Sequence, residues 1–283
     1  MYSPKEVAQN YIPVGVAKTK LPISKMLILG ILAGMFTGFA GVGSTISSAT
    51  VESASMVRLL MGLMFPVGVA MSIVAGGELF TGNCLLIIPA LEKQAKISGV
   101  LKNLVFVYIG NLLGGILVAA LVVYGHTLSL FGNQAAVSAI GTAVAKVTTP
   151  FADVLYRGIL CNVLICAAVW MTFAAKDVAG KIIGLFMPIM IFVLCAFENS
   201  VANMYYIAAG LFAATNPVYA AAMPTGTRLS ELTWGNFFLK NLLPSSLGNA
   251  IGGAVLVGLA YWFVYLRGAD KPALKAPVHA GKK

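Results

Sequence analysis

Long apolar runs separated by short polar segments dominate the sequence. A helix that crosses a bilayer needs about 20 apolar residues. Six runs reach that length, and an even number of spans places both termini on one side of the membrane. The predicted spans are residues 26–48, 59–91, 101–124, 154–175, 182–212 and 237–266.

The second and fifth runs are too long for one simple span and carry polar residues at their centres. The second contains GGELFTGN at 76–83, and the fifth contains AFEN at 196–199. Broken backbone and ionisable residues persist at membrane depth only where they face protein or a water-filled path. We therefore expect a break in each run, with Thr81 capping the half-helix after the first break and Asn199 or Ser200 capping the half-helix after the second.

The two halves of the chain repeat one another. Three matched patterns occur in the same order, with offsets of 128, 120 and 138 residues, as differing loop lengths would give. Each repeat would hold three spans, an odd number, so the second must enter the membrane inverted. Inverted repeats with paired broken helices place a permeation site near the midplane. The matches are Gly-Ile-Leu at 30–32 and 158–160, Glu-x4-Asn at 78–83 and 198–203, and Gly-Asn-x-x-Gly-Gly at 110–115 and 248–253.

Composition supports a multi-pass membrane protein. Of 283 residues, 59% are hydrophobic and only 10% are charged, whereas a soluble domain carries roughly 25% charged residues. No secretory signal peptide is evident at the N-terminus. The net charge of +10 is explained by cytoplasmic loops, where Lys and Arg collect, so we expect no nucleic-acid partner.

Loop charges predict the orientation and the domain organisation. The two termini and the loops predicted on their side carry 14 basic residues, which places both termini in the cytoplasm and the protein in the cytoplasmic membrane. Ser3-Pro4-Lys5-Glu6 predicts a capped amphipathic helix on the membrane surface. We expect one channel domain over 1–283: this helix in 1–25, the repeats in 26–125 and 150–267, and a cytoplasmic tail in 268–283.

Two half-helix N-termini would point at the centre of the membrane, each with roughly half a positive charge. A small anion is attracted to such ends. Glu78 and Glu198 resemble proton-relay or cation-site residues. We favour a scaffold role, in which each accepts hydrogen bonds from backbone amides of its own segment, because an exposed carboxylate would oppose anion entry. By sequence alone, Lys146 in the outer loop 143–150 is a solvated surface charge.

Enzymatic and metal chemistry lack the residues they need. Cys84, Cys161, Cys166 and Cys195 all fall inside apolar runs, which is typical of small core residues. The two histidines lie near no other metal ligands, so we expect no metal and no cofactor. An intramembrane enzyme would need a nucleophile and base pair at membrane depth, and we expect none.

Four stretches carry a resemblance to a known family. GGELFTGN, RGILCNVLICAAVWMTF, FENSVANMYYI and NLLPSSLGNAIGGAVLVGLAYWFVYLR resemble the formate/nitrite transporter family, whose bacterial members include formate, nitrite and hydrosulfide channels. The likeness covers essentially the whole chain. It implies an all-α, aquaporin-like bundle of six helices in a homopentamer embedded in lipid, with one pore through each protomer.

The resemblance assigns the constrictions and the substrate contact by motif. Thr81 matches the threonine of the loop in the second span. Val69 and Leu79 match the cytoplasmic constriction. Phe65 and Phe192 match the periplasmic one.

The resemblance also assigns polar residues along the path. Lys146 and Asn162 match the pair that raises the positive potential beside the central site, which reverses the interpretation of Lys146 from sequence alone. Asn249 matches a polar lining residue of the last span. Members commonly read Phe-Glu-His-Ser at the second break, whereas this chain reads Phe-Glu-Asn-Ser with Asn199. Asparagine does not titrate, so water or an electropositive vestibule would have to supply any proton, and the choice between them stays open.

The predicted function is passive or proton-coupled transport of small monovalent weak-acid anions. Formate is the leading substrate, with nitrite and hydrosulfide as alternatives. A neutral-solute channel of the water and glycerol type is the alternative of another class. It should carry Asn-Pro-Ala in both halves, and the sequence has only Asn216-Pro217-Val218. Whether the N-terminal helix gates the pore stays open.

Overall fold

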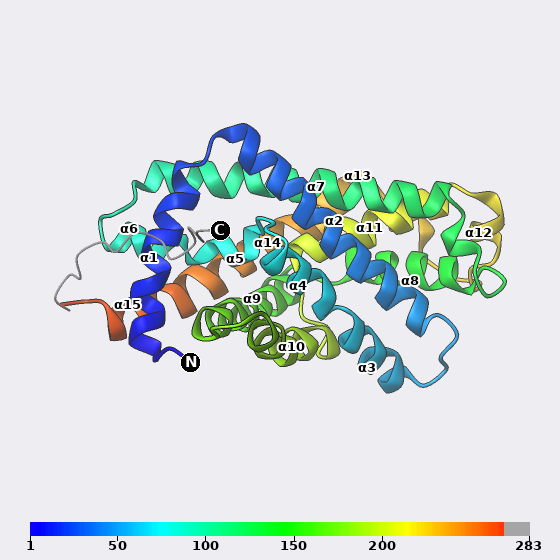
Figure 1. The fold of residues 1–283 in the computed structure, drawn as a ribbon. Coiled ribbons are helices and arrows are strands. Elements are labelled where there is room, and N and C mark those ends of the chain that lie inside the picture. Colours follow the sequence, from blue (N-terminus) through cyan, green and yellow to red (C-terminus); the bar gives the residue numbers. More distant parts are fainter. Residues whose placement is uncertain (269–283) are drawn as a thin grey trace.

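The computed structural model describes residues 1–268, which form a bundle of helices without a strand in that range (Figure 1). The predicted tail and His279 lie outside the described residues. In the first half the helices are α1 (Pro4–Lys20), α2 (Ile23–Ser48), α3 (Ala54–Met64), α4 (Pro66–Val74), α5 (Phe80–Asn83), η1 (Cys84–Leu86), α6 (Ile87–Leu91), α7 (Ile97–Tyr124) and η2 (Thr127–Ser129).

The second half follows the same order of long and broken helices. Its elements are α8 (Gln134–Thr148), α9 (Phe151–Ala174), α10 (Val178–Leu194), α11 (Ser200–Ala214), α12 (Pro217–Ala221), η3 (Leu229–Glu231), α13 (Trp234–Asn236), η4 (Phe237–Leu242), α14 (Leu243–Ala250), η5 (Ile251–Leu259) and α15 (Ala260–Tyr265). The segments η4 and η5 are π-helical turns within one helical run, Trp234–Tyr265.

Five helices of the described part are long and apolar enough to cross a membrane. They include Ala54–Val74, in which Pro66 separates α3 from α4. This run begins five residues before the predicted start at 59. The predicted fifth span is divided into α10 and α11, each shorter than a full span. Both predicted breaks are therefore present, at 75–79 and 195–199.

Glycines let two helix pairs approach closely. A Cβ on Gly30 of α2 would stand 2.9 Å from the Val107 carbonyl oxygen of α7. A Cβ on Gly158 of α9 would stand 2.9 Å from the Ser245 carbonyl oxygen of α14. Only glycine leaves room for such backbone contact. The sequence matches at 30–32 and 158–160 thus mark equivalent helix crossings.

Helix α1 packs against protein. The predicted capping box is present: Ser3 accepts from the Glu6 backbone N–H, and Glu6 accepts from the Ser3 backbone N–H at 2.7 Å. Val7, Ala8, Tyr11 and Ile12 on its apolar face are buried. In Figure 1 α1 crosses the end of the bundle where α6 and α15 lie, and it contacts both. The apolar face of α1 therefore packs against the bundle, and its place on the membrane surface stays a prediction.

Two further expectations are corrected. Lys146 belongs to the last turn of helix α8, not to a loop over 143–150. At 15 residues the helix is shorter than a membrane span, so the length criterion that located the spans does not locate it, although its buried residues follow the helical period. Cys84, Cys161 and Cys166 are buried free thiols, as expected, but Cys195 is exposed because α10 ends just before it.

Candidate functional site

The first break is a non-helical segment of five residues, 75–79, which starts with a turn at 75–76. Gly76 has φ of +92°, a left-handed conformation that glycine adopts without cost. A Cβ on Gly77 would lie 2.8 Å from that of Ala33. The Gly77 and Glu78 N–H groups bond to the carbonyls of Ser72 and Leu29 at 2.6 and 3.1 Å. The glycine pair therefore ends the half-helix, as predicted.

The second break has the same backbone route. Ala196, 120 residues after Gly76, also has positive φ, +54°. The Phe197 N–H bonds to Phe192 O at 2.9 Å, and the Glu198 N–H bonds to Arg157 O at 3.3 Å. Here an alanine takes a conformation in which its Cβ is unfavourable. The turn was not visible in the sequence, which lacks the glycine pair.

Two asparagines on neighbouring helices brace the breaks. Asn111 of α7 accepts from the Phe80 N–H at 3.0 Å and donates to the carbonyls of Glu78 and Gly30, both at 2.8 Å. Asn249 of α14 accepts from the Ser200 N–H at 2.9 Å and donates to the carbonyls of Glu198 and Gly158 at 2.9 and 2.8 Å. Each amide satisfies backbone groups that a broken helix leaves without partners.

Capping differs between the two half-helices. Asn199 caps α11 as predicted, accepting from the backbone N–H groups of Val201 and Ala202 at 2.9 and 3.1 Å. Thr81 does not cap α5. The helix begins one residue earlier, at Phe80, whose N–H is bonded by Asn111 instead. The predicted cap was wrong because the acceptor comes from another helix, which local sequence does not show.

Glu78 lies in a buried cluster of side chains. Lys18 of α1 forms an ion pair with it at 3.0 Å and donates to Asn83 Oδ1 at 3.0 Å. Asn83 donates to Glu78 at 2.6 Å and to Asn103 at 2.8 Å. Asn103 closes the cluster by donating to the Lys18 carbonyl at 3.1 Å.

Glu198 lies in the matching cluster. Lys146 of α8 pairs with it at 3.0 Å, and Asn203 donates to it at 2.6 Å. Asn203 also donates to Asn241 at 2.7 Å, and Asn241 donates to the Lys146 carbonyl at 3.1 Å. The clusters differ in two contacts. Asn83 Oδ1 accepts from Lys18, whereas Asn203 Oδ1 is buried without a partner among the described residues. Asn241 also donates to Glu198 at 3.5 Å, a contact that Asn103 does not make with Glu78.

The carboxylates thus have a scaffold role, but with partners other than those predicted. Lysine and asparagine side chains, not backbone amides of the break, bind Glu78 and Glu198. A buried carboxylate carries a large desolvation cost unless a cation and hydrogen bonds compensate it. Each cluster supplies both, so each glutamate is held as part of a neutral pair.

Asn162 of α9 joins the two half-helix starts. Its amide donates to the carbonyls of Thr81 and Asn249 at 3.1 and 2.6 Å. Because Asn249 binds Ser200, a connected series of hydrogen bonds runs from Thr81 to α11. Within the described residues, Asn162 Oδ1 and Ser200 Oγ remain buried without partners. Lys146 contacts Glu198, and no hydrogen bond joins it to Asn162.

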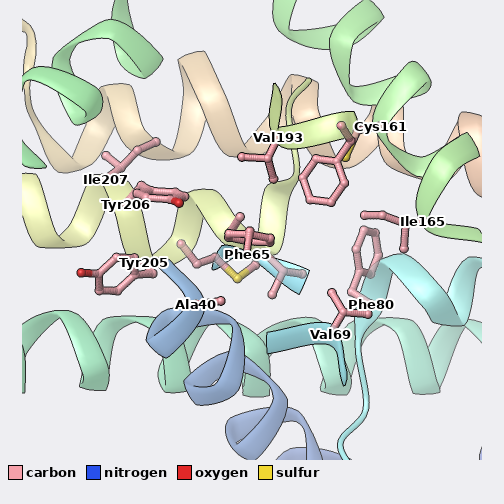
Figure 2. Close-up of a cluster of buried hydrophobic side chains, with 14 of the residues drawn as sticks. Ala40, Phe65, Val69, Phe80, Cys161, Ile165, Val193, Tyr205, Tyr206 and Ile207 are labelled. Atoms are coloured by element: carbon pink, nitrogen blue, oxygen red, sulfur yellow. The ribbon is translucent and has the colours of Figure 1, made fainter. Parts of the chain in front are cut away.

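The four predicted constriction residues fall into two places. Val69 and Leu79 line a cavity of about 580 Å³ that reaches α1 and also contains Lys18. Phe65 and Phe192 are both buried, and their ring centroids lie 5.6 Å apart, edge to face. Figure 2 shows Phe65 between Tyr206 on one side and Val69 with Phe80 on the other.

The sequence interpretation missed Lys18, Asn103, Asn111 and Asn241 as members of the site. One signal was available for the lysine: Lys18 and Lys146 are 128 residues apart, the offset that relates Gly30 to Gly158. For the asparagines, Asn103 and Asn241 share the offset of 138 with Asn111 and Asn249. Extending the repeat beyond its glycines would have found all four.

Comparisons with known proteins agree on one family. The model described as "Formate/nitrite transporter" matches residues 5–263. A "Probable formate transporter" of Methanothermobacter thermautotrophicus is 34% identical, with 94% of this chain and 97% of the relative covered. "Formate channel FocA" of Escherichia coli K12 is 33% identical, with 94% and 95% covered.

A solved structure supports the same assignment. The "Pentameric formate channel with formate bound" superposes with a TM-score of 0.76 at 32% identity, covering 86% of this chain and 98% of that one.

Proposed function

This chain belongs to the formate/nitrite transporter family, and on that premise we propose that it carries small monovalent weak-acid anions across the cytoplasmic membrane, with formate as the leading substrate. The observation that supports this most directly is the pair of buried ion pairs, Lys18–Glu78 and Lys146–Glu198. They remove the negative charge that carboxylates would otherwise place beside both breaks.

The same geometry favours an anion over a cation. With Glu78 and Glu198 neutralised, no net negative charge opposes the α11 N-terminus, where the helix dipole attracts an anion. A cation path at this depth would instead need carboxylates free to coordinate. The Lys146–Glu198 pair adds no net charge, but it is a dipole, and we assign the path to its ammonium side, where the local potential is positive.

We assign the path by combining the geometry with the family resemblance. Thr81, Asn199, Asn162 and Asn249 surround the centre, where the series of hydrogen bonds joins the two breaks. Anions would leave the cavity at α1 through a cytoplasmic constriction at Val69 and Leu79. They would meet the periplasmic constriction at the pair Phe65 and Phe192.

Asn199 replaces the usual histidine in a fixed orientation. Its Oδ1 is occupied by the Val201 and Ala202 N–H groups. The amide NH2 is therefore the end left to meet a substrate, and it donates at every pH. Any proton that accompanies the anion would come from water or from the vestibules. Transport that is proton-coupled would then depend on the acidity of the substrate and not on this side chain.

The assembly and orientation follow the same relatives. The related solved channel is described as pentameric with formate bound, and we propose a homopentamer with one path per protomer. The equivalent contacts at both breaks support two inverted repeats in an aquaporin-like arrangement. The charge distribution supports cytoplasmic termini. Nitrite and hydrosulfide have the charge and size to follow the same path.

A flux panel tests the function. The purified protein is reconstituted into liposomes, and uptake of formate, nitrite and hydrosulfide is measured between pH 5 and 8 against empty vesicles. We expect formate to cross fastest. Permeability to water or glycerol, with none to the three anions, would favour the neutral-solute channel instead. Against that alternative, Asn216 caps α12 by accepting from the Val218 N–H at 3.0 Å, and it lies after α11, outside both breaks.

A further inference from the structure

We propose that the Tyr206 hydroxyl donates a hydrogen bond to the substrate at the periplasmic constriction of Phe65 and Phe192. The path would then favour anions that accept hydrogen bonds through oxygen. This inference rests on the proposed function, and it adds a residue that selects among the candidate anions. Tyr206 lies on α11, seven residues after Asn199. Seven residues are two helical turns, so both side chains project from the same face of the helix.

The hydroxyl is buried and has no partner. Tyr206 is 6% exposed, and its oxygen has no hydrogen-bond partner among the described residues. The nearby Ser44 hydroxyl donates instead to the Met61 carbonyl at 3.1 Å. Buried hydroxyls in folded proteins are almost always bonded, because an unpaired one loses its bonds to water without replacement. A donor kept unpaired next to a proposed path is therefore available to a transient ligand.

Tyr206 lies close to both a cation and the aromatic constriction. Its ring lies nearly parallel to Phe65, at 19° and 6.3 Å between centroids. Phe65 in turn contacts Phe192 edge to face. Lys146 Nζ lies 5.8 Å from the centre of the Tyr206 ring. An anion drawn toward Lys146 would reach Tyr206 before it passes the apolar rings.

Hydrogen bonding at this point discriminates between anions of equal charge. An anion sheds water to pass two phenylalanine rings, and a donor at their edge replaces part of that hydration. Formate and nitrite accept hydrogen bonds strongly through oxygen, whereas the sulfur of hydrosulfide is a weak acceptor. The field of Lys146 acts equally on formate and hydrosulfide. The ratio of their fluxes therefore isolates the contribution of the hydroxyl.

The test is the formate-to-hydrosulfide flux ratio in proteoliposomes for the wild type, Tyr206→Phe and Tyr205→Phe. Tyr205 is the matched control: it is buried with an unpaired hydroxyl, but Figure 2 shows that hydroxyl pointing away from Phe65. We expect Tyr206→Phe to lower the ratio roughly tenfold, which corresponds to about 1.4 kcal/mol, and Tyr205→Phe to leave it within twofold.

A second variant guards against a folding defect. Tyr206→Gln restores an N–H donor and is expected to keep the ratio closer to the wild type than Tyr206→Phe does, with the oligomer checked by size exclusion. An unchanged ratio in Tyr206→Phe, or an equal fall in Tyr205→Phe, would overturn the inference. If the wild type still carries formate in that case, the proposed function stands. Absence of wild-type formate flux would instead overturn the proposed function.

Discussion

Lys18 and Lys146 hold equivalent places at the two breaks. Each pairs with the glutamate of one break at 3.0 Å, and the backbone carbonyl of each accepts from an asparagine at 3.1 Å. Lys18 comes from the helix that precedes the first span, and Lys146 from the helix that precedes the fourth. The correspondence between the two halves therefore extends beyond the spans to the helices that precede them.

Replacing Lys146 by Ala should weaken both stability and anion entry. It leaves Glu198 as a buried, unpaired carboxylate, which should lower the free energy of unfolding by about 3 kcal/mol. It also removes the positive charge beside the second break. We expect a lower melting temperature in detergent and slower formate uptake. The double variant Lys146→Ala/Glu198→Gln should recover stability but not uptake, because the amide needs no cation while the positive charge is still missing. Full recovery of both would contradict the electrostatic role.

Replacing Asn249 by Leu should destabilise the second break. The change leaves the Ser200 N–H and the Glu198 carbonyl without their side-chain partner, while the Gly158 carbonyl keeps its bond within helix α9. Each buried group left unpaired lowers the free energy of unfolding by about 1 to 3 kcal/mol. Asn111→Leu should cost a similar amount, since it makes the same three contacts at the first break. Thermal unfolding of the two variants measures this. A large loss of stability for one variant and none for the other would show that Asn111 and Asn249 are not equivalent.

Replacing Asn199 by His should add a pH-dependent component to transport. A histidine with the ordinary pKa of about 6.5 gains a positive charge as the pH falls through that value. The ratio of variant to wild-type formate flux is then expected to rise below pH 6.5. Asn216→His is the matched control, because Asn216 caps an exposed helix in the same way. Identical pH profiles for Asn199→His and the wild type would place residue 199 off the path.

Replacing Ala196 by Gly should stabilise the protein, whereas Gly76→Ala should destabilise it. Both positions have positive φ, and the left-handed conformation costs a residue with a Cβ roughly 1 to 2 kcal/mol. A Cβ on Gly76 would meet nothing within 4 Å, so backbone strain alone is tested. Opposite shifts in melting temperature are expected. Equal melting temperatures would show that the breaks relax around the added Cβ.

Most of the architecture could be predicted from the sequence. Apolar run length located the long helices, and the glutamates and glycines within the runs located both breaks. The family resemblance indicated Lys146 from the sequence. Helix α8 was predicted as a loop because its 15 residues are fewer than a span needs. The packing of α1 against α6 and α15 depends on distant helices, which local sequence does not show.

The sequence by itself determined the lipid-facing pattern, the broken helices and their repetition, since these follow from local composition and periodicity. Only the tertiary structure decided which groups satisfy the broken backbone and the two carboxylates. Four side chains reach the breaks from other helices, at sequence separations of 31 to 60 residues: Asn111, Asn249, Lys18 and Lys146. Hydrogen-bond and charge compensation act through space, and chain order alone carries no record of those distances.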